Sequence, residues 1–319
     1  MSLSAGITGA GGFIGAHAVR GFAARGAVVT PFLRAPDGAP KTRTLEDAIA
    51  DPGLFAGLDV VVHAAAVRHR YGVDAREYRA SNVALVERTL RASAAAGVRR
   101  FVLVSSVGVY GFPSALPVTE RAPYAPRTLY SATKVEAESC ARRVARELGV
   151  ELVIVRPTIV YGPGDRNGML GKMAAMIRAG SYRIVGSGDN VLHHAYVDDV
   201  VDGLWLAASR TEAAGEDFIL AGPETTTLAE LSGLVAHAVG RPVARAHVPL
   251  PIARAAAAVI DVAAYRGLAF GAREPPVNTE KLDVMTIAIR FDVGKARSRL
   301  GFAPRVGYEA GVRETLGDW

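Results

Sequence analysis

Thr8-Gly9-Ala10-Gly11-Gly12-Phe13-Ile14-Gly15 is the segment that specifies the fold of this 319-residue chain. Three of its glycines, Gly9, Gly12 and Gly15, recur every third residue between a short first strand and the helix that Phe13-Ile14 begins. Such a turn lets the backbone approach the pyrophosphate of a dinucleotide at a helix N-terminus. A plain structural turn gives the same spacing, so the glycines predict a dinucleotide site only in combination with motifs further along the chain.

Short β-branched runs alternate with helix-length segments through the first half of the chain. We expect each run to be a strand buried on both faces. Strand, helix and strand repeated in this way indicate an α/β fold. It is a Rossmann-type, doubly wound parallel sheet with helices on both faces and right-handed crossovers. The runs lie at residues 28–30, 60–62, 101–104 and 152–155.

Beyond Arg156 this alternation stops, and frequent prolines and glycines separate mostly helical pieces. The change predicts a dinucleotide-binding Rossmann domain over residues 1–156 and a smaller, mostly helical substrate-binding lobe over residues 157–319. Asp217-Phe218-Ile219-Leu220 nevertheless has the pattern of a strand. We therefore expect the second lobe to be interleaved with returns to the first domain, at about residues 190–225.

The composition excludes several classes of protein. Half of the residues are apolar, which is enough to form a hydrophobic core that needs no disulfide bond or bound metal for stability. The single cysteine, Cys140, rules out an intramolecular disulfide and a multi-cysteine metal site, and fits a reducing cytosol. No apolar run approaches a bilayer span, and the net charge of +6 comes from scattered arginines rather than a dense basic run. We expect a cytoplasmic protein with no metal, no membrane and no nucleic-acid partner.

Tyr130 and Lys134 lie four residues apart in a predicted helix, so their side chains share a face. A free phenol titrates at about 10, and a neighbouring ammonium ion lowers that value toward neutrality. Ser106 follows the strand predicted at 101–104, at the carboxyl edge of the sheet where open α/β folds bind ligands. These are the groups that hold a carbonyl oxygen, move its proton and compensate its charge during hydride transfer.

The glycine turn, Ser105-Ser106 and Tyr130-Ser-Ala-Thr-Lys134 appear in the order typical of one family. With them the chain resembles the extended short-chain dehydrogenase/reductases, the NAD-dependent epimerase/dehydratase-like proteins. The resemblance implies that Ser106, Tyr130 and Lys134 are catalytic and that Lys134 also binds the nicotinamide ribose. The catalytic hydroxyl of the family stands four residues before the position of Tyr110, which selects Ser106 and leaves Ser105 as the alternative.

The resemblance also implies where the cofactor binds. Small side chains end the third strand of the family, where the dinucleotide lies against the backbone. An asparagine of the following helix supports the cofactor in the family, and Asn82 matches it, although an ordinary N-cap explains Asn82 nearly as well. Thr44-Leu45 stands at an adenine-contacting pair whose first member is usually aspartate. The implied contacts are Gly9, Gly12, Phe13, Ile14, Gly15, Arg34, Leu45, Ala64, Ala65, Ala66, Asn82, Ser105, Tyr130, Lys134, Pro157 and Thr158.

The end of the second strand selects between NADP and NAD. In the family an acidic residue there holds the adenosine ribose hydroxyls of NAD. Leu33 stands at that position and Arg34 follows it. A guanidinium group suits the 2′-phosphate of NADP, so the sequence favours NADP with NAD as the alternative. The simpler interpretation is that Arg34 is one more exposed arginine of an arginine-rich chain.

Two comparisons within the family bear on the reaction and the substrate: the first disfavours dehydration, and the second favours a hydrophobic substrate. Dehydratases carry an acidic pair just after the active-site hydroxyl, where this chain has Val107-Gly108. The C-terminal third resembles the branch of 3β-hydroxysteroid dehydrogenase-like and dihydroflavonol reductase-like proteins. We therefore expect an NAD(P)-dependent reductase or dehydrogenase that acts on the carbonyl or alcohol group of a small, hydrophobic molecule. The alanine-rich segment at 252–264 is predicted to be a helix, either in the core or lining the substrate pocket.

Two other functions remain open from the sequence. A nucleotide-sugar epimerase is the main alternative, since a set of basic residues is large enough to clamp a diphosphate. A sensor that has lost turnover is the other, and the intact Ser106, Tyr130 and Lys134 speak against it. His193-His194 is interpreted as an exposed loop pair, and a homodimer is among the open assembly states. The basic residues are Arg166, Lys172, Arg178, Arg183 and Arg273.

Overall fold

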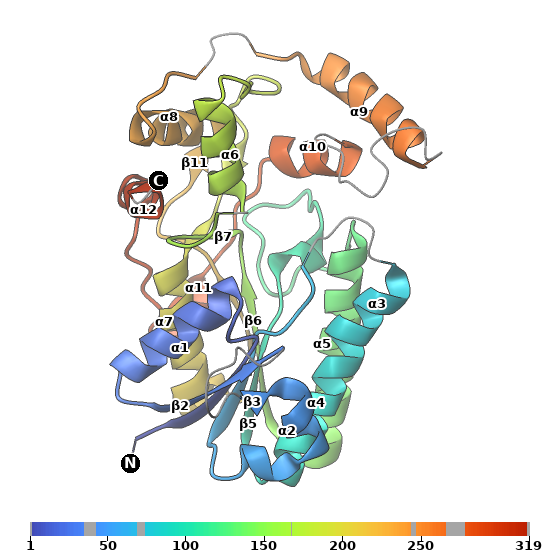
Figure 1. The fold of residues 1–319 in the computed structure, drawn as a ribbon, viewed down its shortest axis with the longest axis vertical. Coiled ribbons are helices and arrows are strands. Elements are labelled where there is room, and N and C mark those ends of the chain that lie inside the picture. The colour runs from blue at the N-terminus through green and yellow to red at the C-terminus, as the bar shows by residue number, and fades with distance from the viewer. Residues whose placement is uncertain are drawn as a thin grey trace.

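The computed structural model describes residues 2–34, 43–68, 74–166, 168–243, 247–265 and 278–317, so Arg273 lies outside it. Among these residues, seven parallel strands form one sheet in the order β10-β6-β5-β4-β1-β2-β3 (Figure 1). The order reverses between β1 and β4, the point where doubly wound sheets bind dinucleotides. The predicted Rossmann-type α/β fold is confirmed. The strands are β1 Ser4–Thr8, β2 Val28–Leu33, β3 Arg43–Thr44, β4 Val60–His63, β5 Arg100–Val104, β6 Glu151–Pro157 and β10 Asp217–Leu220.

Helices cover both faces of the sheet (Figure 1). Phe22 and Leu204 are fully buried against the strands on one face of the sheet. Leu90 and Ala141 are fully buried on the opposite face. Within the described part of the chain, no helix combines the length and the apolar character needed to cross a bilayer. The first face carries α1 Phe13–Ala24, α7 Val197–Ser209 and α11 Gly294–Leu300, and the second carries α2 Leu45–Ala50, α4 Leu85–Ala95 and α5 Leu129–Leu148.

Three of the expected strands are present as β4, β5 and β6, with almost every residue buried. β2 is also present, but the expectation that both of its faces are buried is wrong, since Val28 is 58% exposed. The reason is that β3 pairs only with Phe32 and Leu33, so no strand among the described residues lies on the outer side of the first part of β2. Pro31 is tolerated there because no described strand on that side requires its missing N–H.

The chain returns to the sheet at β10, as predicted for residues 217–220. Phe218 pairs with Val155 of β6 in a parallel register. The other C-terminal elements form a lobe at the end of the sheet where β6 leads into β7 (Figure 1). They are β7 Val160–Tyr161, α6 Met169–Arg178, β8 Val191–Leu192, β9 Ala195–Tyr196, β11 Thr226–Thr227, α8 Leu228–Ala238, α9 Leu250–Tyr265, α10 Thr279–Thr286 and α12 Tyr308–Leu316.

α9 forms at the alanine-rich segment, as predicted, but it is not a core helix. Ala253 and Ala257 pack with Leu282 of α10 in a small separate cluster. Ile252 and Val259 on another side of the helix are 62% and 69% exposed. The helix is apolar on nearly all sides, so its sequence pattern could not distinguish a buried face from an exposed one.

The interpretation of His193-His194 as exposed is wrong, because both residues are buried. His193 Nε2 donates to the Gly222 carbonyl at 3.0 Å, and the Phe291 N–H donates to His193 Nδ1 at 3.1 Å. The His193 ring therefore joins two segments that are distant in the sequence. Both ring nitrogens are used in this way, which makes His193 a structural residue rather than a ligand.

We predict that His194→Phe makes the protein less sensitive to acid. Burial, with His193 adding to it, lowers the pKa of His194 to about 3, whereas an unfolded histidine titrates at about 6.5. Between these values the unfolded chain binds more protons, so stability falls as the pH decreases. The loss from one such histidine is at most about 1.4 kcal/mol per pH unit. Urea unfolding at a series of pH values within this window measures the slope, which the variant should reduce.

Phenylalanine keeps the edge-on ring contact with Tyr308, and His194 Nδ1 has no hydrogen-bond partner among the described residues. His237→Phe on α8 is the matched control, since His237 is exposed and its loss should not change the slope. A slope in His194→Phe equal to that of the wild-type protein would contradict the prediction.

Candidate active site

The glycine turn is shaped by close backbone contacts. Gly9 has a φ of +67°, and a Cβ on it would lie 2.7 Å from the Ala65 nitrogen after β4. A Cβ on Gly15 would lie 2.1 Å from the Gly9 carbonyl oxygen. α1 begins at Phe13 after Gly12, which has no side chain to cap the helix. The N–H groups of the first helical turn have no partner within the helix, so this turn fits a pyrophosphate.

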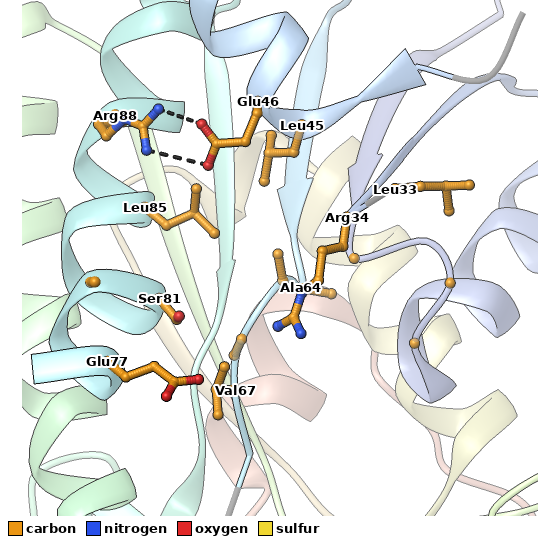
Figure 2. Close-up of a pocket in the computed structure, with 16 residues that line it drawn as sticks. Leu33, Arg34, Leu45, Glu46, Ala64, Val67, Glu77, Ser81, Leu85 and Arg88 are labelled. Atoms are coloured by element: carbon orange, nitrogen blue, oxygen red, sulfur yellow. Dashed lines mark hydrogen bonds and ion pairs between the residues drawn. The ribbon is translucent and has the colours of Figure 1, made fainter. Parts of the chain in front are cut away.

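A pocket of about 730 Å³ opens beside this turn. The glycine turn and the ends of β2 and β4 form one wall, and α2 with the segment that leads into α4 forms the other (Figure 2). Its shape and position fit the adenosine half of a dinucleotide, which binds at the switch point of such sheets. The residues predicted to bind the cofactor that line it are Gly9, Gly12, Arg34, Leu45, Ala64, Ala65 and Ala66.

The end of β2 enters the pocket. Leu33 and Arg34 both line it, and Figure 2 shows the Arg34 guanidinium projecting into its middle, near Ala64. Thr44 explains the departure from the usual aspartate, because its Oγ1 accepts the Asp47 N–H at 3.0 Å and caps α2. The Thr44 hydroxyl is therefore used within the protein, while the next residue faces the pocket.

Asn82 lies in a π-helical turn, η2 Ala80–Ala84, between α3 Ala75–Arg79 and α4, so the alternative that it is an N-cap is wrong. Its Oδ1 accepts the Val67 N–H at 2.8 Å. Its Nδ2 donates to the Val67 carbonyl at 3.0 Å and to Thr133 Oγ1 on α5 at 3.1 Å. Asn82 thus fixes the loop after β4 against α5 and supports the pocket wall from behind. Such π-turns are frequent at functional sites.

Ser106, Tyr130 and Lys134 come together at the carboxyl end of β5. Lys134 is buried, and its Nζ donates to the Val104 carbonyl at 2.9 Å. The same Nζ lies 5.9 Å from the centroid of the Tyr130 ring. Ser106 Oγ accepts the Gly108 N–H at 3.1 Å, and an interaction with the Ser106 side chain lowers the pKa of Tyr130. The fold therefore assembles the three predicted catalytic groups at one end of the sheet.

Burial is the main influence on the pKa of the Tyr130 phenol. Burial raises the pKa of Tyr130 to about 12, and the Arg68 guanidinium and an interaction with the Ser106 side chain oppose the rise. The Lys134 ammonium group binds the Val104 carbonyl and lies 5.9 Å from the centroid of the Tyr130 ring. Burial also lowers the pKa of Lys134 to about 8, while Glu138 opposes that change. At neutral pH Tyr130 therefore holds a proton that it can give, and Lys134 is charged.

The structure distinguishes the two neighbouring serines. Ser105 is buried, and its hydroxyl donates to Glu138 Oε1 at 2.6 Å. Its hydroxyl is thus used within the protein rather than offered to a cofactor. Ser106 is the serine whose side chain interacts with Tyr130 and lowers the pKa of its phenol. The geometry favours Ser106 as the residue that binds a substrate oxygen.

Pro157 and Thr158 lie at the end of β6, beyond the three catalytic groups. The Thr158 N–H donates to the Leu220 carbonyl of β10 at 3.0 Å. The Thr158 Oγ1 atom is buried and has no hydrogen-bond partner among the residues that the structure describes. A buried hydroxyl without a partner is costly unless a ligand satisfies it, so Thr158 fits the polar group of a nicotinamide.

Much of the pocket wall comes from residues that the sequence did not single out. Six of them lie on α2 and on the α3 to α4 segment, which the fold places opposite the glycine turn, while Gly11 belongs to that turn and Val67 follows β4. An ion pair between Glu46 Oε2 and Arg88 Nη2, at 2.5 Å, joins these two elements (Figure 2). No local pattern marks such residues, because their position depends on how distant elements pack. They are Gly11, Glu46, Val67, Glu77, Ala80, Ser81, Leu85 and Arg88.

The basic residues considered for a diphosphate clamp do not converge. Arg166 precedes α6 and Arg178 ends it, and the helix between Met169 and Arg178 alone is about 14 Å long. Lys172 and Arg178 are six residues apart and face different sides of α6. The Arg183 guanidinium donates to two backbone carbonyls beyond the end of the helix, at 2.9 and 2.7 Å.

The sequence is similar to those of known oxidoreductases. Residues 5–221 match the model of the NAD dependent epimerase/dehydratase family. A 3-beta-hydroxysteroid dehydrogenase from Mycolicibacterium neoaurum is 29% identical over 97% of this chain and 89% of that protein. A 4-hydroxy-2-methyl-3-oxo-4-farnesyl-3,4-dihydroquinoline-1-oxide ketoreductase from Stigmatella aurantiaca is 31% identical over 96% of this chain and 93% of that protein.

Solved structures share the fold over nearly the whole chain. UDP-glucuronic acid 4-epimerase from Bacillus cereus, in complex with NAD, has a TM-score of 0.77 and 20% identity, covering 99% of this chain and 96% of that one. MoeE5 in complex with UDP-glucose and NAD has a TM-score of 0.76 and 24% identity, covering 98% and 97%. At these identities the likeness concerns the fold alone.

Proposed function

The chain belongs to the NAD-dependent epimerase/dehydratase family, and we propose that within this family it reduces a ketone, or oxidises the secondary alcohol, of a small hydrophobic molecule with NADP. The observation that carries this proposal is the meeting of Ser106, Tyr130 and Lys134 at the end of β5, beside the pocket at the glycine turn. The relatives named for a steroid and for a farnesylated quinoline support a hydrophobic substrate. In this proposal residues 1–156 hold the cofactor and residues 157–319 hold most of the substrate.

Each catalytic side chain has one task in the proposed reduction. The Ser106 hydroxyl binds the carbonyl oxygen, and Tyr130 gives its proton to that oxygen as negative charge develops there. Lys134 stays protonated and compensates the charge left on the phenolate. The bound nicotinamide cofactor supplies the hydride to the carbonyl carbon. In the oxidative direction Tyr130 takes the proton of the alcohol instead.

An NAD-dependent nucleotide-sugar epimerase is the second candidate. It is favoured by the structures whose names include UDP-sugars and NAD. Against it, Arg166, Lys172 and Arg178 are too far apart to hold one diphosphate. Nucleotide-sugar recognition needs a paired cluster of cations, which the described residues of α6 do not form. We therefore place the reductase first.

One assay distinguishes the two candidates. Purified protein is incubated with NADPH or NADH and a panel of alicyclic and aryl ketones, and separately with UDP- and dTDP-sugars. We expect the absorbance of the reduced nicotinamide to fall with the ketones. Stoichiometric NAD that copurifies with the protein, together with sugar epimerisation and no net cofactor consumption, would replace the reductase by the epimerase.

We propose NADP rather than NAD because Arg34 projects into the pocket at the end of β2 (Figure 2). Arg34→Ala should raise the Michaelis constant for NADPH by about 10- to 100-fold and that for NADH much less. A hydrogen bond to a charged group contributes about 1.5–3 kcal/mol, which corresponds to that range. Initial rates at varied concentrations of each cofactor measure the two constants.

Arg88→Ala is the matched control for this prediction. Arg88 is the other described arginine that lines the pocket, but it is paired with Glu46. Its removal should therefore affect NADPH and NADH to a similar degree. An equal effect of Arg34→Ala on both cofactors would remove the argument for the 2′-phosphate.

A further inference from the structure

An ion pair without any solvent exposure lies behind the active site. The side chains of Glu138 and Arg156 are both 0% exposed. Arg156 Nη2 donates to Glu138 Oε2 at 2.7 Å, and Arg156 Nε donates to Oε1 at 2.9 Å. Replacing a buried ion pair by apolar residues of similar volume is often neutral or stabilising. Stability is therefore not a sufficient reason for this pair, and its contacts indicate a role in the active site.

The pair holds the chain on both sides of Ser106. Before it, the Ser105 hydroxyl donates to Glu138 Oε1 at 2.6 Å. After it, Arg156 Nη1 donates to the Tyr110 hydroxyl at 2.7 Å, at the end of the short helix η3 Val107–Tyr110. Ser106 and its turn are thus bracketed by two residues that bind the same ion pair.

Glu138 also follows Lys134 by one turn of α5. Residues four apart are neighbours on a helix surface. Lys134 binds the Val104 carbonyl, and Glu138 binds the hydroxyl of the next residue, Ser105. Two successive turns of α5 therefore form hydrogen bonds with two successive residues at the end of β5. An anion this close to an ammonium group favours its protonated form.

The other ionisable groups around Lys134 do not replace this anion. His63 on β4 is buried, and its pKa is lowered to about 3, so it is neutral at pH 7. Tyr130 on α5 keeps its proton up to high pH. Arg156 on β6 is a cation, and Asp217 on β10 is paired with Arg156 at 2.8 Å.

We propose that Glu138 is a positioning residue of the active site, which keeps Lys134 protonated and, through Ser105, fixes the end of β5 that carries Ser106. Glu138 acts through these neighbours and takes no part in the chemistry itself. The importance of this arrangement for turnover rests on the proposed function. The protonation of Lys134, by contrast, can be measured without substrate or cofactor.

Lysine NMR tests the proposal directly, because the chain contains only five lysines. Protein labelled with ¹³C at the lysine Cε is titrated up to about pH 10.5, the ordinary lysine pKa. The Lys134 signal is assigned by its loss in Lys134→Arg. We expect a midpoint of about 8 in the wild-type protein. In Glu138→Gln the midpoint should be lower by about one pH unit or more.

Glu136→Gln is the matched control on the same helix. Glu136 is 38% exposed and pairs with Arg79 on α3, so its loss should leave the midpoint of Lys134 unchanged. If Glu138→Gln does not fold, Glu138→Gln with Arg156→Gln removes both buried charges and leaves no unpaired ion. A downward shift is expected there too, but a smaller one, because the Arg156 cation is removed together with the Glu138 anion. A midpoint equal to that of the wild type, in either folded variant, overturns the proposal.

Ser105→Ala tests the positioning part, because it keeps the ion pair and removes only the tie to β5. We expect kcat for ketone reduction to fall by roughly tenfold, with the Michaelis constant for NADPH within about twofold and the Lys134 midpoint unchanged. An unchanged kcat overturns this part. Failure of the wild-type protein to reduce any ketone would count against the proposed function and would leave the NMR result intact, so the two failures are distinguishable.

Discussion

Tyr130→Phe should abolish ketone reduction almost completely. We expect kcat to fall by about 10²- to 10⁴-fold, the usual contribution of a positioned general acid. The phenol is protonated at neutral pH and interacts with Ser106, so its loss removes the proton donor and one partner of the substrate oxygen. The binding of NADPH should stay near that of the wild type, because the ring of Phe occupies the same space. Single-turnover hydride transfer and NADPH fluorescence titration measure the two quantities separately.

Tyr182→Phe is the control for the loss of a buried tyrosine hydroxyl. Tyr182 lies in the C-terminal lobe, and its hydroxyl bonds to Ser232 Oγ at 2.9 Å, away from the end of β5. This variant should keep most of the turnover. Retention of most activity in Tyr130→Phe would show that another group donates the proton.

Gly9→Ala should have the second largest effect, on both stability and cofactor binding. Its φ of +67° is unfavourable for alanine by about 1–2 kcal/mol. The new Cβ would lie 2.7 Å from the Ala65 nitrogen, and overpacking of this kind costs about 1–3 kcal/mol more. Together we expect a loss of about 2–5 kcal/mol in the free energy of unfolding. Tm should fall by about 2–4 °C for each kcal/mol, as scanning calorimetry can measure.

The same variant should weaken NADPH binding by at least about tenfold, since a loss of about 1.4 kcal/mol is sufficient. Gly11→Ala is the matched control in the same turn. A Cβ on Gly11 would touch only the Leu33 side chain, at an ordinary 3.5 Å. Its effect on stability should stay within about 0.5 kcal/mol. Equal effects of the two substitutions would mean that the contact with Ala65 is not what makes Gly9 necessary.

The local features of this protein could be predicted from the sequence because they depend on residues close together in the chain. The spacing of Gly9, Gly12 and Gly15 indicates a strand, a turn and a helix, and these elements are present as β1 and α1. The four-residue spacing of Tyr130 and Lys134 puts them on one face of α5. The alternation of apolar runs also indicated the parallel sheet, since both faces of its central strands are covered.

The errors came from properties that depend on distant parts of the chain. The exposure of Val28 follows from the two-residue length of β3 at the edge of the sheet. The burial of His193 follows from its bonds to Gly222 and Phe291. The Val104 carbonyl that binds the Lys134 ammonium group was not expected either. None of these partners is visible in the local sequence.

Periodicity and spacing, which act over a few residues, were enough to establish the order of elements, the glycine turn and the helical face shared by Tyr130 and Lys134. The folded chain was needed to learn which serine reaches Tyr130, which residues of α2 and α4 complete the pocket, and that Glu138 and Arg156 hold the chain on both sides of Ser106. This division arises because hydrogen bonds and burial depend on which surfaces meet after folding. The packing of whole helices and strands makes that choice, rather than any one segment.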